Sequence, residues 1–296
     1  MASILNILAP IFLIILLGAL LRVTRFAPPE LFRGTNRLVY WVAMPCALFY
    51  QTAEARIEGG AAFRVFATLV IAGFTMIVGV AGALAQDDVK RILSFHVVSQ
   101  IGYMIMGLGL FTVAGVAGAV LFLVHQIPVK TVMFLAGGLI EDDQGTSALK
   151  KVGGLATSKP VIAVLFALPA LSLAGLPPFS GFVAKLALVD AGISSGAYVI
   201  VAVSLVGSIL TLLSMTKIWI GAFWGEVTPS AVPASGRRSV TIMQTAAGIA
   251  VAGTIAVAVV AGPLWRMSEE VATDLLDRTP YIVDVLGGAV GAEEVD

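Results

Sequence analysis

The stretch Ala174-Gly175-Leu176-Pro177-Pro178-Phe179-Ser180-Gly181-Phe182 interrupts an otherwise apolar segment that runs from about residue 160 to residue 193. Two prolines and two glycines cannot continue a regular helical hydrogen-bond ladder, so we expect a helix broken at this point. Non-helical backbone at membrane depth is tolerated where it packs in protein or lines a cavity, and broken helices recur at transporter ion sites. The alternative is a loop between two independent helices, the second too short to span a membrane.

The composition of the whole chain is that of a membrane protein. Hydrophobic residues make up 58% and charged residues 12% of the 296 residues, whereas a soluble domain usually carries about 25% charged residues. This excludes a soluble enzyme, a nucleic-acid-binding protein and a disordered chain. One cysteine, Cys46, excludes a disulfide framework, a Cys-rich zinc site and an iron–sulfur cluster held by this chain alone. We therefore expect no metal site and no cofactor.

The apolar runs predict about eight membrane-spanning helices, at about 20 residues for each span. Gly and Ala are abundant in these runs, which favours a helical bundle over a barrel. The first positive charge, Arg22, follows the first run, so this run is expected to be a permanent anchor rather than a cleaved signal peptide. The expected spans are approximately 4–21, 37–53, 63–85, 92–110, 114–140, 160–193, 196–222 and 240–264.

The distribution of basic residues predicts the orientation. The connections after the first, third, fifth and seventh spans hold eleven Lys and Arg residues, and the opposite side holds four. Basic residues favour the cytoplasmic side, so both termini are expected to face away from the cytoplasm. In the acidic tail, residues 268–286 could form an amphipathic helix at the outer surface or remain solvated.

Three lysines fall within the expected spans, although a lysine at the bilayer centre costs on the order of 2.5–3.5 kcal/mol on insertion scales. Such residues usually face a bundle interior and mark an ion or proton path. Lys130 shares a helix face with Gln126, and His125 lies to one side of that face. Imidazole titrates near neutral pH, so these groups could pass a proton through water. The alternative is a lysine that extends to the membrane interface and a histidine bonded to a carbonyl.

Lys185 is the second candidate for the proton path, because it follows the break by one helical turn. Lys217 is a possible accessory group, but it lies near the cytoplasmic end of its span, where extension to the interface explains it equally well. His96 is a weaker accessory candidate that could simply be hydrogen-bonded near the interface. Asp190 could pair with a lysine or lie at the outer boundary.

Two further motifs carry a resemblance. Residues 82–96 read Gly-Ala-Leu-Ala-Gln-Asp-Asp-Val-Lys-Arg-Ile-Leu-Ser-Phe-His, with Ser-Gln-Ile-Gly-Tyr at 99–103, and the segment from His125 to Lys130 is followed by Phe134-Leu135 and Gly137-Gly138. With the Pro-Pro-Phe-Ser-Gly-Phe break, they resemble the antiporter-like membrane subunits of complex I and of Mrp-type cation/proton antiporters. The likeness is greatest to the D-type Mrp subunit, over about residues 69–287.

This resemblance implies a role for each residue at the break and before it. Lys130 resembles a proton-relay lysine, Lys185 the lysine of a broken helix, and His125 a group in the wet path between them. Gln126 stands where the family often has a second histidine. The fold implied is all-α and integral to the membrane, similar to the second of two inverted repeats.

The front of the chain departs from this family, because the first repeat has no counterpart. Residues 2–67 instead resemble the start of the auxin efflux carrier family, through residues 11–18, 28–32 and 36–40. The expected organisation is an N-terminal membrane segment at 1–67, an antiporter-like transmembrane domain at 68–266 and an acidic tail at 267–296. Such a chain is a fusion of two truncated transporters, either genuine or from a misassembled reading frame.

The leading hypothesis is a non-enzymatic subunit of a monovalent cation/proton antiporter in a bacterial cell membrane. Its expected partners are the lipid bilayer, other antiporter subunits in a hetero-oligomer, protons and cations such as sodium, with no nucleic acid. One alternative is a proton-pumping subunit of NADH-quinone oxidoreductase, although the chain has no dinucleotide fingerprint with which to oxidise NADH itself. A non-transporting chimeric fragment and an efflux carrier for small organic anions are the others.

Overall fold

The computed structural model describes residues 61–226 and 237–277, and this part of the chain is an all-α membrane bundle. Five of its helices are long and apolar enough to cross a membrane. They are α4 (Ala61–Ala85), α5 (Val89–Gly109), α6 (Val113–Gln144), α10 (Tyr198–Ile218, extended by the π-helical turn η2, Trp219–Phe223) and α11 (Arg237–Val259). The spans expected at 63–85, 92–110, 114–140 and 196–222 are thus confirmed. Those at 4–21 and 37–53 lie outside the described residues.

The segment 160–193 is broken where the prolines and glycines predict. It forms α8 (Pro160–Ala174) and α9 (Ser180–Ser194). Gly175 ends α8 with a φ of +86°, a left-handed conformation that glycine adopts without strain. Its N–H donates to the carbonyls of Leu171 and Ser172, which closes the last turn of the first half-helix.

The last expected span, 240–264, ends earlier than predicted, because α11 stops at Val259 and a new helix, α12 (Ala261–Leu276), follows. Ser268 and Ala272 of α12 are buried, and Ala272 packs with Val116 and Ala117 of α6. The first part of the predicted acidic tail, residues 267–276, is therefore the end of a packed helix with an apolar face. The rest of the predicted helix 268–286 lies outside the described residues.

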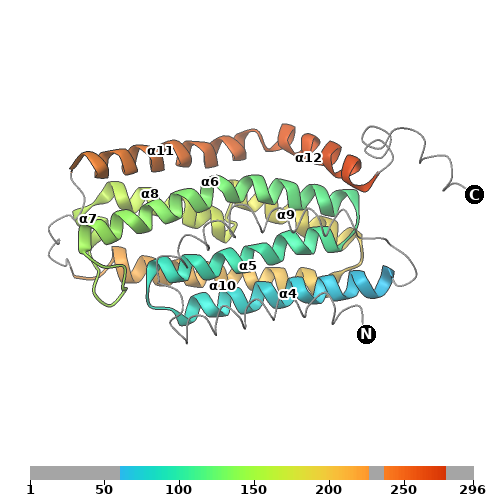
Figure 1. Ribbon diagram of the computed structural model, residues 1–296, viewed down its shortest axis with the longest axis horizontal. Helices are drawn as coiled ribbons and strands as arrows, with labels where there is room; N and C mark the ends of the chain where they lie inside the picture. The colour runs from blue at the N-terminus through green and yellow to red at the C-terminus, as the bar shows by residue number, and fades with distance from the viewer. Residues whose placement is uncertain (1–60, 227–236, 278–296) are drawn as a thin grey trace, which may run out of the picture. The chain divides into compact units, whose positions relative to one another are not determined.

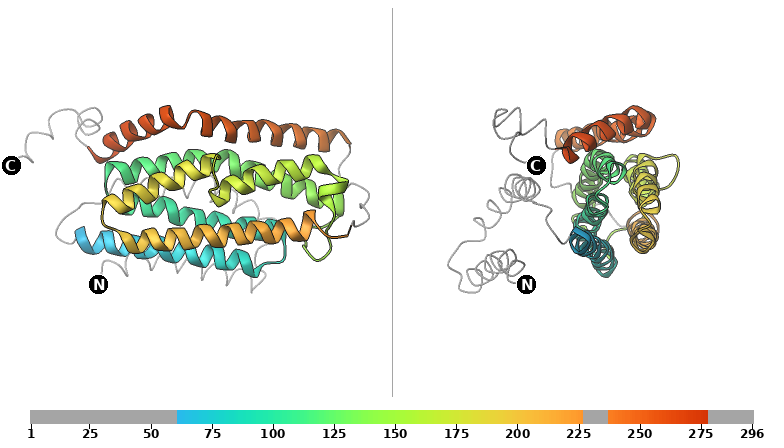
Figure 2. Two further views of the ribbon diagram at one scale, coloured as in Figure 1. Left: turned by 180° about the vertical axis from the view of Figure 1, so that it is seen from behind. Right: turned by 90° about the vertical axis from the view of Figure 1, so that its right-hand side faces the viewer.

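Helix α6 is the centre of the described bundle, since α5, α8, α9, α11 and α12 all pack against it. Figure 1 shows α11 and α12 following one another along α6. Seen end on in Figure 2, α6, α5 and α4 form one row, and the two half-helices with α10 form a second. The break in α8 and α9 therefore faces the middle of α6.

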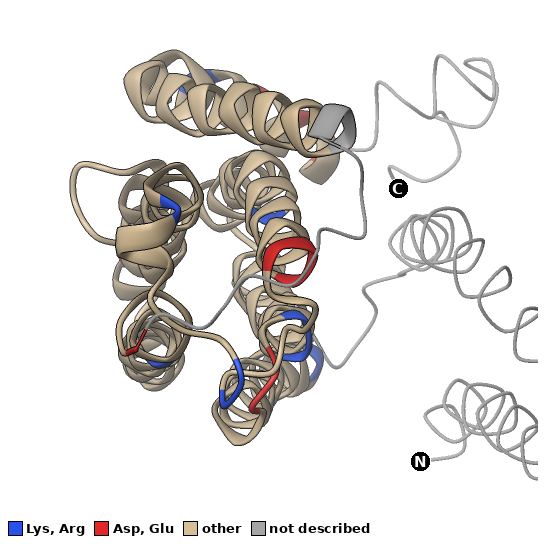
Figure 3. Ribbon diagram, turned by 90° about the vertical axis from the view of Figure 1, so that its left-hand side faces the viewer, with Lys and Arg blue, Asp and Glu red and all other residues tan. Residues whose placement is uncertain are grey.

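Charged residues gather at one end of the bundle, where α4, α6 and α10 end and α5 begins (Figure 3). The ion pairs at this ionic end are Lys90–Glu141, Lys150–Asp87 (3.1 Å), Lys217–Asp87 (2.9 Å) and Lys159–Asp143 (2.8 Å). The hydrogen bonds from Lys217 and Lys150 hold the pKa of Asp87 below its usual value. These pairs join segments that are distant in sequence.

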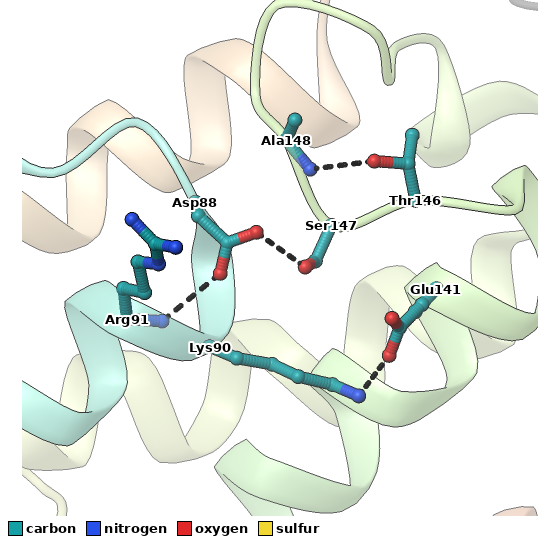
Figure 4. Close-up of polar contacts among 7 residues, drawn as sticks. All are labelled: Asp88, Lys90, Arg91, Glu141, Thr146, Ser147 and Ala148. Carbon is teal, nitrogen blue, oxygen red and sulfur yellow. Dashed lines mark hydrogen bonds and ion pairs between the residues drawn. The ribbon is translucent and has the colours of Figure 1, made fainter. Parts of the chain in front are cut away.

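Asp88 fixes the start of α5 at this end (Figure 4). Its carboxylate accepts from the Arg91 N–H at 3.0 Å and from the Ser147 hydroxyl at 2.6 Å. Burial raises the pKa of Asp88, but these two hydrogen bonds, the charge of Arg91 and the Lys90 N–H together leave the pKa below its usual value. The turn between α4 and α5 is thereby held against the chain that follows α6.

Candidate functional site

A band of buried polar side chains crosses the bundle between two apolar clusters. On α6, Phe122 belongs to one cluster and Val129 to the other. On α5, Leu93 and Tyr103 are divided between the clusters in the same way. The polar band lies between them and comprises His96, Ser99, Gln100, His125, Gln126, Ser172, Ser180, Lys185, Ser204, Thr211 and Ser214.

Lys185 binds the end of the first half-helix from the second. Its Nζ donates to the carbonyl oxygens of Leu173 at 3.0 Å and Ala174 at 3.2 Å. The last carbonyls of a helix have no partner within that helix and carry its negative partial charge, so they suit an ammonium group. The amine also lies 5.1 Å from the centre of the Tyr103 ring, whose face attracts a cation. Lys185 thus lies at the break, with 7% of its surface exposed.

His125 joins α6 to both half-helices. Its Nδ1 is hydrogen-bonded to the Ser180 hydroxyl at 2.9 Å, and that oxygen lies 3.2 Å from the Ser172 hydroxyl. The Gly181 N–H also donates to the Ser172 oxygen. The end of α8 therefore lies between His125 and Lys185. Ser172 contacts Ser180, the partner of His125, and the next two residues of α8 bind Lys185.

Lys130 places its amine in the interior. Its Nζ is buried and has no hydrogen-bond partner within the described residues, and therefore does not extend to an exposed surface. Gln126 donates to the Gln100 side chain at 3.4 Å across the contact between α5 and α6. The other buried side-chain atoms without a partner in this part of the chain are His96 Nδ1, Gln100 Nε2, His125 Nε2 and Gln126 Oε1 in the polar band, and Gln144 Oε1 at the end of α6. Since buried polar atoms are normally paired with protein or ordered water, their concentration here suits a hydrated passage.

The three accessory candidates have different surroundings. Lys217 lies at the ionic end, where its amine binds Asp87 and the carbonyls of Leu84 and Gln86, and so ties α10 to the end of α4. His96 is fully buried in the polar band rather than at the interface. Asp190 is exposed on α9, and Lys185 donates to carbonyls rather than to this carboxylate.

Sequence reasoning did not identify the hydroxyl groups around these lysines. Ser172 and Ser180 lie in or beside the break motif, and Tyr103 ends the segment 99–103, but none of them was assigned a role. Their signal is weak, because serine and threonine in membrane helices often bond only their own backbone. In residues 61–226 and 237–277, no three His, Cys, Asp or Glu side chains gather as a metal-binding group.

Comparison with known proteins identifies the family. A family model described as NADH:quinone oxidoreductase/Mrp antiporter, TM, matches residues 59–211. The chain is 44% identical over 218 residues to the D-type subunit of the Na(+)/H(+) antiporter of Alkalihalophilus pseudofirmus, a match that covers 74% of this chain and 44% of that relative. It is 37% identical over 156 residues to the corresponding D-type subunit of Bacillus subtilis, covering 53% and 32%. The chain therefore spans less than half the length of these relatives.

Solved structures agree with this assignment. The Mrp complex from Dietzia sp. DQ12-45-1b contains a chain that is similar with a TM-score of 0.70 and 36% identity, over 75% of this chain and 49% of that one. Respiratory complex I from Thermus thermophilus with bound NADH is similar with a TM-score of 0.63 and 23% identity, over 74% and 46%, which is a likeness of fold. The family match begins at residue 59, so the resemblance of residues 2–67 to auxin efflux carriers stays a prediction.

Proposed function

The chain belongs to the NADH:quinone oxidoreductase/Mrp antiporter transmembrane family, and on this premise we propose that it is a membrane subunit of a monovalent cation/proton antiporter. The observation that carries the proposal is the Lys185 amine on the carbonyls at the break of α8 and α9. Broken helices whose ends bind ions inside a membrane bundle are typical of ion-coupled transporters, and here a lysine amine that can take up a proton occupies such a break. The names of the relatives as subunits of Na(+)/H(+) antiporters support the same function.

Protons pass between Lys130 and Lys185 through His125 in this proposal. Lys130 and His125 are five residues apart on α6, about 7.5 Å of helix rise, so the relay requires water between them. A neutral imidazole can accept a proton on one ring nitrogen and release one from the other. His125 has one nitrogen without a partner in the described bundle and the other on Ser180, so it is suited to this relay.

The end of α8 completes the relay. From Ser180, the hydrogen bond to Ser172 brings the relay to the last turn of α8, and water would carry the proton from the Ser172 hydroxyl to the Lys185 amine, which the Leu173 and Ala174 carbonyls hold. A neutral amine there accepts the proton, and the two carbonyls stabilise the ammonium that forms. Because two ammonium groups in one apolar interior repel each other, a proton arriving at one lysine favours release from the other.

The proposed setting is a bacterial cell membrane with the ionic end of the bundle towards the cytoplasm. The excess of Lys and Arg in the connections at this end supports that orientation, and with it termini that face away from the cytoplasm. In this proposal, exchange of sodium or another monovalent cation is carried out together with partner subunits, as the names of the relatives as antiporter subunits support. The chain is a transporter subunit and not itself an oxidoreductase.

Everted membrane vesicles test this function. We expect vesicles from antiporter-deficient cells that express the chain with its partner subunits to release protons from an acidified lumen when sodium is added, which a pH-sensitive dye detects. Vesicles without the chain serve as the control. A complex that assembles but gives no sodium-dependent response contradicts the proposal. Proton uptake driven by NADH, with redox subunits in the purified complex, indicates the oxidoreductase alternative instead.

A further inference from the structure

Helices α5 and α10 run antiparallel, and polar side chains meet along their contact. Tyr103 of α5 donates its hydroxyl to the Ser204 carbonyl at 2.5 Å, and the same oxygen lies 2.9 Å from the Ser208 hydroxyl. Two turns away, the His96 Nε2 is hydrogen-bonded to the Ser214 hydroxyl at 2.8 Å. His96, Tyr103 and Ser214 are each at most 1% exposed, so these groups lie inside the protein.

The buried side of α10 continues the polar row between these two contacts. Ser208, Thr211 and Ser214 follow one another at helical spacing, and Thr211 is fully buried. Neighbouring positions of this kind have Cβ atoms about 5–6 Å apart, a gap that one water molecule can bridge. We call Ser208, Thr211 and Ser214 the hydroxyl row.

The hydroxyl row extends from the Lys185 site to the ionic end. At one end, the ring of Tyr103 lies beside the Lys185 amine, and its hydroxyl contacts Ser208. At the other end, Lys217 follows Ser214 by three residues and lies at the surface with Asp87. The distance from Ser208 to Lys217 along α10 is about 14 Å.

We propose that the hydroxyl row, with Tyr103 and His96 opposite it, is the access route by which protons pass between Lys185 and solvent at the ionic end. This inference rests on the proposed function, to which it adds a connection between the buried relay and one aqueous side. Each hydroxyl can accept one proton while it donates another. Water would fill the gaps within the row and between the Tyr103 hydroxyl and the Lys185 amine. A proton that enters from solvent is then matched by a proton delivered to the amine, and the groups between them are unchanged.

The mouth of the route holds one carboxylate and two ammonium groups. The Lys217 and Lys150 ammonium groups would repel an incoming proton, and the Asp87 carboxylate, 2.9 Å from Lys217 and 3.1 Å from Lys150, offsets part of this repulsion. Half of the Asp87 side chain is exposed, so the mouth meets solvent. The Lys217 amine also binds the carbonyls of Leu84 and Gln86, which holds it aside from Ser214.

Two threonines of α10 provide a matched test. Thr211 is buried and donates to the Gly207 carbonyl at 2.8 Å, whereas Thr216 is exposed and donates to the Leu212 carbonyl at 2.9 Å. Valine has nearly the shape of threonine without its hydroxyl. We expect Thr211→Val to lower sodium-dependent proton exchange in the vesicles about tenfold, since one hydroxyl of the row, and with it one proton carrier of the route, is lost. Thr216→Val should retain the wild-type rate.

Two further readouts separate the route from a structural effect. Thr211→Val should leave the sodium concentration for half-maximal rate unchanged and should increase the ratio of rates in H2O and D2O, because proton movement becomes limiting. Ser214→Ala should have the same effects, and it provides the test if Thr211→Val fails to assemble.

Three results overturn the route. Exchange at the wild-type rate in both Thr211→Val and Ser214→Ala, while Lys185→Ala is inactive, would remove the route but leave the relay. An equal loss in Thr216→Val would show that the effect is not specific to the row. Absence of exchange in wild-type vesicles would remove the proposed function and the route with it.

Discussion

Lys185→Ala is expected to abolish sodium-dependent proton exchange in everted vesicles, and Lys130→Ala is expected to do the same. Each substitution removes an amine that is the only group at its position able to hold and release a proton in the relay. Dye fluorescence after sodium addition measures the loss. Lys151→Ala is the matched control, because Lys151 is exposed at the ionic end and should be dispensable.

Loss of charge must be distinguished from loss of packing at Lys185. The stem of this lysine lies against Gly175, where an added Cβ would come within 2.8 Å of the Lys185 Cδ. Lys185→Met retains an unbranched stem of similar length and removes the amine. We expect it to assemble normally and to be inactive. Unaltered exchange in Lys185→Met and Lys130→Ala would defeat the proposed relay.

Gly181→Ala is expected to disrupt the junction of the two half-helices. A Cβ at this position would overlap the Ser172 carbonyl oxygen and would lie 3.0 Å from the His125 ring. Because the nearest atoms belong to backbone, the clash can be relieved only if α8 and α9 move apart. Overpacking of this kind costs roughly 1–3 kcal/mol, and movement would also separate Ser172 from Ser180.

Thermal unfolding of the purified chain in detergent measures this effect. Gly181→Ala should lower the unfolding temperature and eliminate exchange. Gly248→Ala in α11 is the matched control, because no atom lies within 4 Å of the Cβ it would add. An unfolding temperature equal to that of wild type in Gly181→Ala would show that the half-helices are not in such close contact.

Much of the fold follows directly from sequence patterns. Apolar length alone predicts α4, α5, α6 and α10, because a membrane span has few other ways to satisfy its backbone. The cluster of prolines and glycines locates the break, since few other residues end a helix inside an apolar run. The positions of Lys130 and Lys185 within apolar segments identify them as candidates, because a charge inside the membrane is costly and usually marks a functional site.

Other features depend on tertiary contacts that no local pattern encodes. Lys217 and Lys185 both lie among apolar residues in the sequence. The partner of Lys217, the Asp87 carboxylate, is supplied only where α10 meets the turn after α4. The burial of Thr211 and the exposure of Thr216 likewise depend on which side of α10 faces α5. The end of α11 at Val259 is different, because Pro263 in the sequence removes the N–H that would donate to the Val259 carbonyl.

Labelling with a membrane-impermeant amine reagent at neutral pH tests most directly whether the two lysines are held away from bulk solvent. The reagent is applied to the intact complex, and mass spectrometry of its peptides would give the extent of modification at each lysine. We expect Lys150 and Lys151 to react readily, and Lys130 and Lys185 to remain unmodified until the protein is unfolded. Modification of Lys130 and Lys185 at the rate of Lys151 in the folded complex would contradict a proton path through buried amines.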